Sequence, residues 1–417
     1  MKYDVIIIGF GKGGKTLAAT LAKKGEKVAL IEASEKMYGG TCINVGCIPS
    51  KYLVDNAEEI DGHMSFERKA EKYGRVVKEK KALTAMLRKK NYDKLDGLSN
   101  VDIIVGTASF IGERTVKVQG KEEMQLSGEK IIINTGSLPV IPNIPGIEAN
   151  PNVYTSESLM EEEDLPRKLT IIGGGYIGLE FASMYAGFGS DVTMLIHGSD
   201  FIPREDEDIA SEIKKSLEDK GVKILMSSDT KKVDGSTVVY DRDGEEFSIE
   251  ETKVLIATGR RANTKALDLE NAGVQMTDRG LIKVDEHLKT TAPGIWAMGD
   301  VCEPLQFTYI SLDDYRIVSA DILRSGEYTT KERKNVPYSV FLSPTFSRVG
   351  INEKEAKKQG RQVKVVTMPA AAIPKAQVLK KPQGILKGII DKETGKILGV
   401  MLFCQDSHEM INIIKLA

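Results

Sequence analysis

The chain opens with an unbroken run of apolar and β-branched residues, YDVIIIG (3–9). The spacing of apolar positions in KTLAATLAKKG (15–25) is that of an amphipathic helix, and a second apolar run, KVALIE (27–32), follows it. Continuous apolar runs are typical of strands that are buried on both faces of a parallel sheet. The pattern predicts a strand–helix–strand unit, and RKLTIIGGGYIGLEFASMYAGFGSDVTMLI (167–196) repeats it.

Later apolar runs extend this organisation. IIINTG (131–136) and VLIATG (254–259) both read as strands that end in Thr-Gly, and GLIKVDEHLKTTAPGIWAMGDV (280–301) contains a further strand ending at Gly-Asp. The prolines and the glycine in PVIPNIPG (139–146) predict a stiff extended linker. After residue 336, the runs YSVFL, QVKVVTMP, GILKGIID and ILGVMLFC alternate with a helix, which predicts an α+β domain.

Each strand–helix–strand unit carries the spacing G-x-G-x-x-G at its first turn. The glycines are Gly9, Gly11 and Gly14 in the first unit, and Gly173, Gly175 and Gly178 in the second. In this context the first glycine allows a tight turn, the second lets the backbone approach a pyrophosphate, and the third lets helix and strand pack closely. The phosphates then lie at the N-terminus of the helix. We therefore expect an α/β protein with two Rossmann-like domains that bind two dinucleotides.

The residue at the end of the second strand distinguishes the two nucleotides. Glu32 ends this strand in the first unit, where a carboxylate binds a free ribose hydroxyl, as FAD provides. The corresponding residue in the second unit is Ile196, which cannot bind a 2′-hydroxyl and does not repel a 2′-phosphate. His197 and Arg204 follow closely and could supply positive charge to a phosphate. The second site accepts NADPH or NADH, and we favour NADPH.

The composition argues against a nucleic-acid-binding protein and against a membrane-spanning one. With 417 residues, 28% of them charged, and a net charge of −2, the chain has no basic excess of the kind that nucleic acids attract. The one lysine-rich run, residues 69–90, predicts the solvated face of a long helix. No apolar run reaches the roughly 20 residues that a membrane span needs. Four cysteines in a chain of this length do not make a disulfide scaffold, so we expect a cytoplasmic protein.

Two of the four cysteines, Cys42 and Cys47, lie together in GGTCINVGCIPSK (39–51). The pair could bind a metal, form a structural crosslink, fill the core as small apolar residues or act as a redox pair. A zinc site needs about four ligands, and none of the four histidines lies near the pair. We therefore expect no metal site and favour the redox pair.

GGTCINVGCIPSK resembles the redox-active disulfide motif of the flavoprotein disulfide reductases, and the order of the glycine motifs, the Thr-Gly strands and TTAPGIWAMGDV matches that family along essentially the whole chain. Five segments resemble the reactive-chlorine-resistance (RclA-type) branch of this family, which includes hypothiocyanous acid reductases. They are MYGGTCINVGCIPSK, LQFTYISLDDYRIV, RKNVPYSVF, AAAIPKAQV and FCQDSHEMINIIK. The resemblance implies a homodimeric oxidoreductase that uses FAD and NADPH or NADH in oxidative-stress defence. Its substrate would be a small oxidant, most simply hypothiocyanous acid or a related reactive chlorine species.

The resemblance also implies roles for single residues. Cys47 resembles the thiolate next to the flavin and Cys42 the interchange thiol that attacks the substrate, while Lys51 and Glu180 resemble the ion pair beside the flavin. Motifs and resemblance together predict FAD contacts from Gly9, Gly11, Gly14, Glu32, Thr41, Ala108, Thr135, Gly136 and Asp300. They predict NAD(P) contacts from Gly173, Gly175, Tyr176, Ile177, Gly178, His197, Arg204 and Gly259. Tyr176 resembles the residue that gates the nicotinamide pocket, the alternative being a helix-surface aromatic. Asp300 resembles the ligand of the flavin ribityl chain, the alternative being a helix cap.

The implied domains are an FAD-binding domain (1–150 and 266–335), an NAD(P)-binding domain (151–265) and a dimerisation domain (336–417). The family has a C-terminal His-Pro…Glu segment whose histidine acts as an acid–base group across the dimer, and the 417 residues contain no counterpart. We expect that the sequence is incomplete or that the protein works without this base. The alternatives in function are a glutathione-disulfide or dihydrolipoamide/mercuric-type reductase, and a flavin redox sensor with low turnover.

Overall fold

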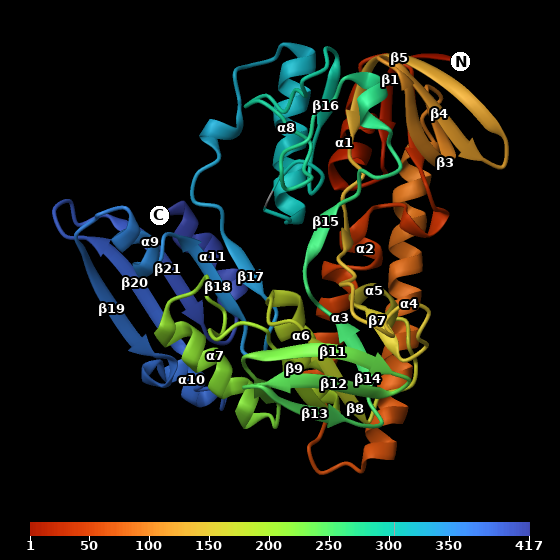
Figure 1. The fold of residues 1–417 in the computed structure, drawn as a ribbon. Coiled ribbons are helices and arrows are strands. Elements are labelled where there is room, and N and C mark those ends of the chain that lie inside the picture. The colour runs from red at the N-terminus through yellow and green to blue at the C-terminus, as the bar shows by residue number, and fades with distance from the viewer. Residues whose placement is uncertain (304) are drawn as a thin grey trace. The chain divides into compact units, whose positions relative to one another are not determined.

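The computed structural model describes residues 1–303 and 305–417 (Figure 1). The chain divides into two compact units, and each is built from three separate stretches. Unit 1 contains Met1–Pro49, Lys80–Pro139 and Arg260–Lys334. Unit 2 contains Ser50–Glu79, Val140–Gly259 and Asn335–Ala417. The finer domain limits near residues 150, 265 and 335 stay predictions.

Unit 1 is built on a sheet with the strand order β1-β2-β3-β4-β5-β16, in which β1 also pairs with β5. Its strands are β1 (Lys2–Ile8), β2 (Val28–Glu32), β3 (Val101–Gly112), β4 (Thr115–Gly120), β5 (Glu123–Ile133) and β16 (Ile295–Ala297). β1, β2, β5 and β16 run parallel, while β3, β4 and β5 form an antiparallel meander, which the sequence did not predict. Helix α1 (Lys12–Ala22) packs on α8 (Thr308–Leu323). A short ribbon pairs β6 (Ser137–Pro139) with β15 (Arg260–Ala262).

Unit 2 contains a second parallel sheet, in the order β10-β9-β8-β14-β7. Its strands are β7 (Val153–Thr155), β8 (Lys168–Ile172), β9 (Asp191–Leu195), β10 (Lys223–Leu225) and β14 (Lys253–Ile256). The connecting helices are α5 (Ser156–Leu159), α6 (Tyr176–Phe188) and α7 (Glu207–Asp219). A three-stranded meander follows, formed by β11 (Ser228–Asp234), β12 (Thr237–Arg242) and β13 (Glu245–Ile249). The unit thus holds the predicted second strand–helix–strand turn, β8–α6–β9.

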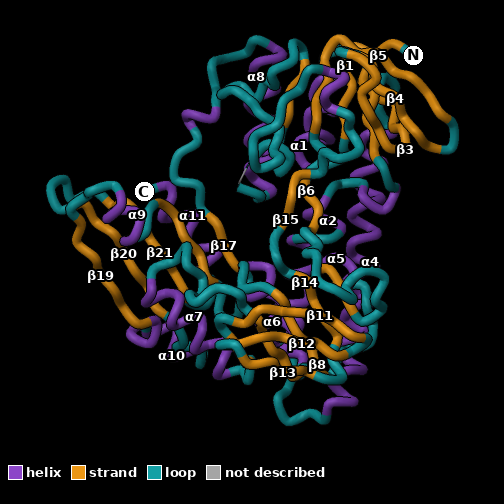
Figure 2. The backbone as a smooth tube through the Cα atoms, in the orientation of Figure 1, coloured by secondary structure: helices purple, strands orange, loops and turns teal. Residues whose placement is uncertain are grey.

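The C-terminal part of unit 2 is an antiparallel sheet in the order β17-β18-β21-β20-β19 (orange in Figure 2). Its strands are β17 (Tyr338–Val340), β18 (Phe346–Gly350), β19 (Val363–Pro369), β20 (Ile385–Asp391) and β21 (Ile397–Phe403). Its helices are α9 (Glu353–Lys358), α10 (Pro374–Val378) and α11 (Ser407–Leu416). Four of these strands match the predicted runs, whereas β18 was not predicted. Short 3-10 turns lie at Glu35–Met37, Leu269–Ala272, Thr330–Glu332 and Ala370–Ala372.

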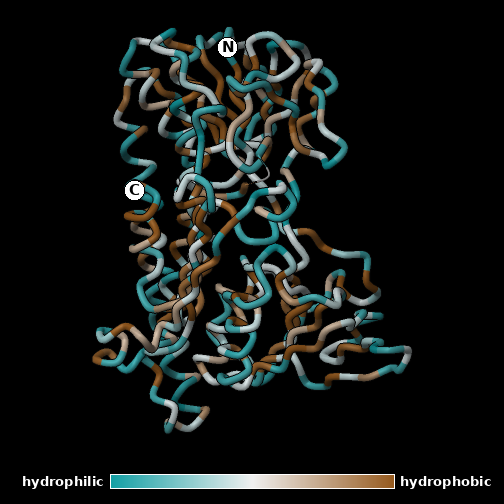
Figure 3. Tube along the Cα trace, turned by 90° about the vertical axis from the view of Figure 1, so that its left-hand side faces the viewer, coloured by the Kyte–Doolittle hydropathy of each residue, from teal (hydrophilic) through white to brown (hydrophobic). Residues whose placement is uncertain are grey.

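Apolar and polar stretches alternate along the chain (Figure 3), and the apolar strands supply the cores. In unit 1 the core contains Ile6 and Ile7 of β1 and Ile132 of β5, all fully buried. In unit 2, Leu179 of α6 and Phe346 of β18 belong to one continuous core. The C-terminal sheet is therefore packed directly against the β8–α6–β9 turn of the same unit, which matters for the site below.

Two further predictions can be compared with the structure. The lysine-rich run lies in a long helix, α4 (Phe66–Asp96), as expected, but the whole run is not a solvated face, because Lys80 has no exposed surface. Helix α3 (Cys47–Glu58) precedes it. Across the described residues, the structure has no helix that is both long and apolar enough to cross a membrane.

Candidate functional site

The first glycine turn connects β1 to α1 in a geometry that admits no side chain at Gly9. Gly9 has φ +108°, and a Cβ there would lie 2.2 Å from the carbonyl oxygen of Asn134. A Cβ at Gly14 would lie 2.4 Å from the carbonyl oxygen of Gly9. Helix α1 begins after Gly11, which provides no side-chain cap, and the amides of Gly13 and Gly14 in its first turn donate to Ser311 Oγ and Asn134 Oδ1. The positive end of the helix dipole still lies at this turn. This turn fits the pyrophosphate of a dinucleotide.

Asn134 holds this turn in place, and the sequence analysis missed it. Its Oδ1 accepts a hydrogen bond from the amide of Gly14 at 2.8 Å, and its Nδ2 donates to the carbonyl of Met298 at 2.8 Å. The side chain is buried, so both bonds form away from water. Because Met298 directly follows β16, a single amide side chain joins the glycine turn to β16 on the other side of β5.

Glu32 ends β2, where the predicted ribose ligand belongs. Its Oε2 accepts from the amide of Phe10 at 2.9 Å, and its Oε1 accepts from the amide of Ser34 at 3.2 Å. Burial raises the pKa of Glu32, and these backbone hydrogen bonds oppose that change. Each carboxylate oxygen has a second lone pair, so Glu32 retains acceptor capacity for a ribose hydroxyl. The residues of this turn therefore fit FAD.

The other predicted FAD residues of unit 1 lie on several elements. Thr135 follows β5, and its Oγ1 donates to the carbonyl of Asn263 at 2.8 Å. Gly136 has φ +70°, and a Cβ built there would lie 4.0 Å from Oγ1 of Thr41. Ala108 is buried within β3, which lies farther along the sheet. The structure thus brings Gly136 close to Thr41, whereas Ala108 is a core residue of the meander.

Asp300 follows β16 in a polar chain of three residues. Its Oδ2 accepts from Oγ of Ser137 at 2.8 Å, and Ser137 Oγ accepts in turn from Nε of Arg260 at 2.9 Å. Burial raises the pKa of Asp300, while Ser137 and Arg260 lower it. Asp300 does not cap the helix that follows, because the N-cap of α8 is Phe307. The helix-cap alternative for Asp300 is therefore wrong.

The two motif cysteines lie at the starts of two consecutive helices. Cys42 is in the first turn of α2 (Thr41–Asn44), and Cys47 is the first residue of the longer α3. The Cys47 Sγ lies 3.4 Å from Oγ1 of Thr308, the first residue of α8. A helix N-terminus and a hydroxyl donor both favour a thiolate over a thiol. Thr308 was not predicted, since nothing in the sequence relates it to Cys47.

Lys15 is a second residue that the sequence analysis missed. It is the residue after Gly14 on α1, and its Nζ donates to Oδ1 of Asn91. Burial and the charge of Lys12 lower the pKa of Lys15 to about 8, and the Cys42 thiolate acts in the opposite direction. Lys15 is therefore within electrostatic reach of Cys42. The available signal was a lysine directly after the last glycine of the first motif, where the second motif is followed by Leu179.

In unit 2, Lys51 and Glu180 meet at a common residue, Phe341. The Lys51 Nζ lies 3.9 Å from the centre of the Phe341 ring, and the Phe341 amide donates to Oε1 of Glu180 at 2.9 Å. The ring of His408 lies 5.8 Å from the same ring. The sequence predicted Lys51 and Glu180 as a pair and gave no sign of Phe341, which follows β17.

His408 is the second residue of α11. Its Nδ1 is buried and has no hydrogen-bond partner within the described residues, and its Nε2 lies 3.7 Å from Oε1 of Glu409. The other two cysteines, Cys302 and Cys404, are buried. Burial raises the pKa of both thiols, that of Cys404 to about 11. Among the described residues, no three His, Cys, Asp or Glu side chains are grouped to hold a metal ion.

The second glycine turn, between β8 and α6, repeats the first. Gly173 has φ +120°, and a Cβ there would lie 2.4 Å from the carbonyl oxygen of Ala257. A Cβ at Gly178 would lie 2.6 Å from the carbonyl oxygen of Gly173, while Gly175 faces open space. Helix α6 begins without a side-chain cap, and Ile177 is in its first turn. This turn also fits a pyrophosphate.

Ile196 follows β9 and is buried, with its side chain against Gly174 of the turn. His197 is largely exposed, and its Nδ1 lies 3.4 Å from Oδ1 of Asp229. The Arg204 side chain is exposed, and its backbone carbonyl accepts from Nδ2 of Asn352 at 2.9 Å. His197 therefore has an acidic neighbour, Asp229, which the sequence did not predict. Gly259 follows β14 with φ +122° in open space.

Tyr176 is the first residue of α6, directly after the second glycine turn. Its hydroxyl donates to Oε1 of Glu205 at 2.5 Å and lies 3.3 Å from the hydroxyl of Tyr338. Burial and the Glu205 carboxylate raise the pKa of Tyr176. A helix-surface aromatic does not have such partners, so that alternative for Tyr176 is wrong.

Comparison with known proteins gives two family matches. Residues 3–318 match the pyridine nucleotide-disulphide oxidoreductase family, and residues 336–417 match the dimerisation domain of the same enzymes. A probable pyridine nucleotide-disulfide oxidoreductase of Escherichia coli, RclA, is 50% identical over 416 residues, which cover 100% of this chain and 92% of that protein. A dihydrolipoyl dehydrogenase of Bacillus subtilis is 33% identical over 99% of this chain and 89% of that protein.

A solved structure from Escherichia coli is similar over the whole chain. It is the Cu(II) complex of the HOCl-induced flavoprotein disulfide reductase RclA, with a TM-score of 0.93 and 48% identity. The match covers 100% of this chain and 92% of that chain. The predicted α/β architecture with a dimerisation domain is thereby confirmed.

Proposed function

On the premise that this chain belongs to the pyridine nucleotide-disulphide oxidoreductase family, we propose that it reduces a small reactive oxidant, hypothiocyanous acid or a related reactive chlorine species, through Cys42 and Cys47. The family is FAD-binding and NAD(P)H-dependent, and its members are flavoprotein disulfide reductases. FAD, when bound, supplies the transfer of two electrons from the nicotinamide to the cysteine pair. The oxidant and the roles of single residues are the proposed part.

The arrangement of the two cysteines is the observation that carries this proposal. Cys47 begins α3 and has the Thr308 hydroxyl at 3.4 Å, while Cys42 has the cation Lys15 within electrostatic reach. These surroundings favour a thiolate at both positions. A small electrophilic oxidant needs a thiolate and little binding surface, whereas a large disulfide needs a shaped pocket.

The proposed step uses both thiolates and balances. The Cys42 thiolate attacks the sulfur of hypothiocyanous acid, so that a Cys42 S–S bond to the thiocyanate group forms and hydroxide leaves. The Cys47 thiolate then attacks Sγ of Cys42, the Cys42–Cys47 disulfide forms, and thiocyanate leaves. The oxidant gains two electrons and the cysteine pair loses two. NAD(P)H restores them.

We propose NADPH as the nucleotide of the second site and a homodimer as the assembly. With Ile196 at this position there is no carboxylate to repel a 2′-phosphate. The exposed side chains of His197 and Arg204 can approach such a phosphate. The carboxylate of Asp229 beside His197 weakens the attraction at that residue. The match of residues 336–417 to a dimerisation domain supports a dimer, as do exposed apolar residues of that part, such as Val378 and Ile413.

A steady-state assay tests the proposal. The consumption of NADPH and of NADH is measured with hypothiocyanous acid, glutathione disulfide and lipoamide in parallel, for the wild type and Cys42→Ser. We expect rapid NADPH consumption with hypothiocyanous acid alone, abolished in Cys42→Ser. Faster turnover with glutathione disulfide or lipoamide would indicate a disulfide reductase, lipoamide being the expected substrate if the protein acts like its dihydrolipoyl dehydrogenase relatives. Absence of turnover with every oxidant would favour the redox sensor.

A further inference from the structure

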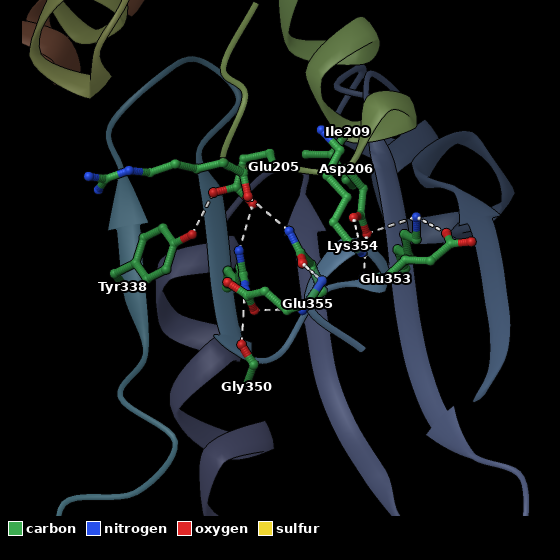
Figure 4. Close-up of polar contacts among 12 residues, drawn as sticks. Glu205, Asp206, Ile209, Tyr338, Gly350, Glu353, Lys354 and Glu355 are labelled. Carbon is green, nitrogen blue, oxygen red and sulfur yellow. Dashed lines mark hydrogen bonds and ion pairs between the residues drawn. The ribbon is translucent and has the colours of Figure 1, made fainter. Parts of the chain in front are cut away.

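A fully buried carboxylate links the start of α6 to the C-terminal sheet within unit 2. Glu205 lies between β9 and α7 and has no exposed surface. Its Oε1 accepts from the hydroxyls of Tyr176, at 2.5 Å, and Tyr338, at 2.6 Å. Its Oε2 lies 3.3 Å from Nη1 of Arg348. Figure 4 shows the Tyr338 hydroxyl directed at this carboxylate.

The C-terminal sheet supplies two partners of Glu205, and they come from adjacent strands. Tyr338 of β17 and Arg348 of β18 are direct partners in the antiparallel register, so they project on the same face. Arg348 also binds Glu355, and its Nε donates to the carbonyl of Gly350 at 3.3 Å. The guanidinium is therefore held independently of Glu205, and it offers the carboxylate a fixed position.

The loop that carries Glu205 is strained and fastened at both sides of this residue. Ile202 has φ +47°, a left-handed conformation that a β-branched residue rarely adopts. The Arg204 carbonyl accepts from Asn352, and the Asp206 carboxylate accepts from the amides of Glu353 and Lys354, at 3.0 and 3.1 Å (Figure 4). Strain of this kind persists only where the surroundings determine it, and it concentrates at functional sites.

Stability alone does not account for such a cluster. A buried ion pair contributes little net free energy compared with apolar residues of the same volume, because both charges lose their hydration. What the ion pair does supply is one defined position for each group. Among the described residues of this cluster, Tyr176 belongs to the predicted nicotinamide site, since it directly follows the second glycine turn.

We propose that Glu205, held by Arg348 and Tyr338, is a positioning residue that fixes the phenol of Tyr176 for the nicotinamide of NAD(P)H. This inference rests on the proposed role of Tyr176 and deepens it. Glu205 does not react. It holds one orientation of the ring. Its partners Tyr338 and Arg348 lie in the part of the chain that matches the dimerisation domain, so the nicotinamide site depends on that part.

The test is anaerobic rapid-mixing measurement of flavin reduction by saturating NADPH, with reduction of the same flavin by dithionite as a reference that bypasses the nicotinamide site. No oxidant substrate is needed, so a wrong assignment of the oxidant does not affect the result. Glu205→Leu and Tyr176→Phe should each slow reduction by NADPH about 10-fold. Neither should change reduction by dithionite. Glu205→Gln keeps an acceptor oxygen for the tyrosine hydroxyls and loses the ion pair with Arg348, so its rate should lie between those of the wild type and Glu205→Leu.

Two further variants separate positioning from stability. The double variant Tyr176→Phe/Glu205→Leu should be no slower than Glu205→Leu, because both changes remove the same hydrogen bond. Lys387→Met breaks a neighbouring ion cluster with Asp206 and Asp208 that does not include Tyr176. It should lower the melting temperature and leave the NADPH rate unchanged. Additive slowing in the double variant, or equal slowing by Lys387→Met, would overturn the proposal.

Discussion

In the first strand–helix–strand unit a Cβ at Gly9 would lie 2.2 Å from the carbonyl of Asn134, and in the second a Cβ at Gly173 would lie 2.4 Å from that of Ala257. The third glycines repeat this agreement, at 2.4 Å for Gly14 and 2.6 Å for Gly178. The two turns share their backbone geometry because both must bring a helix N-terminus close to a strand end.

The side chains around the two turns differ. The first turn has Asn134 bonding the Gly14 amide and Glu32 bonding the Phe10 amide. The second has Ala257 and the buried Ile196 at the equivalent places. This difference shows that steric requirements fix the glycines of a dinucleotide turn, while its polar residues are free to adapt to the nucleotide.

The largest expected effect is that of Gly9→Ala. The new Cβ would meet main-chain atoms in a left-handed backbone, which costs about 4 kcal/mol of unfolding free energy. Chemical unfolding and flavin content would be measured together. Gly175→Ala is the matched control, since Gly175 has an ordinary φ of −78° and open space around it. Equal losses of stability in the two variants would refute the steric account.

Asn134→Ala should remove about 2 kcal/mol of unfolding free energy, because the Gly14 amide and the Met298 carbonyl lose their buried partner. Asn134→Asp keeps the acceptor and loses the donor, so we expect an intermediate loss. Both are measured by denaturant unfolding of the FAD-loaded protein. If Asn134→Ala is as stable as the wild type, the hydrogen bonds of Asn134 do not contribute to the unfolding free energy.

Ile196→Glu places the acid of the first unit in the second. A carboxylate there should repel the 2′-phosphate, so kcat/KM for NADPH should fall about 10-fold relative to that for NADH. Ile196→Val, which adds no charge, should leave the ratio unchanged. A ratio that does not respond to Ile196→Glu would mean that nucleotide choice is decided by other residues.

The smallest effect is expected for Lys15→Met. The second unit has the apolar Leu179 at the equivalent position, so the glycine turn itself does not require a lysine there. Below its pKa of about 8, Lys15 is protonated and favours the Cys42 thiolate. Alkylation of Cys42 in the reduced enzyme should therefore be a few-fold slower in the variant at pH 7. The difference should fade above about pH 8, where Lys15 loses its charge. Lys15→Arg should behave like the wild type, and slowing in that variant would exclude an electrostatic cause.

Local signals in the sequence predicted much of this architecture. Gly9, Gly173 and the apolar runs beside them each depend on residues within one turn or strand, so they could be recognised without a structure. Helix α1 nevertheless begins at Lys12, earlier than its apolar pattern indicated. Strand β18 was missed because its sequence, FSRVG, carries a charge in the middle, and that charge is the buried Arg348.

The missed site residues depend on contacts between distant parts of the chain. The Phe341 amide and Glu180 are 161 positions apart, and Arg348 and Glu205 are 143 apart. No spacing rule connects such pairs, because the sheet order decides which side chains meet. Glu205 in particular reads as one more acid in the polar segment REDED, and only the structure shows that it is buried.

The most direct test of the central claim is mass spectrometry of the Cys42–Cys47 peptide after differential alkylation. The FAD-loaded protein is treated anaerobically with NADPH and then with an equimolar amount of hypothiocyanous acid. We predict that both cysteines are alkylated after NADPH and that neither is alkylated after the oxidant, while Cys302 and Cys404 do not change. If the oxidant is consumed while Cys42 and Cys47 remain reduced thiols, electrons do not pass through this pair, and the account is wrong.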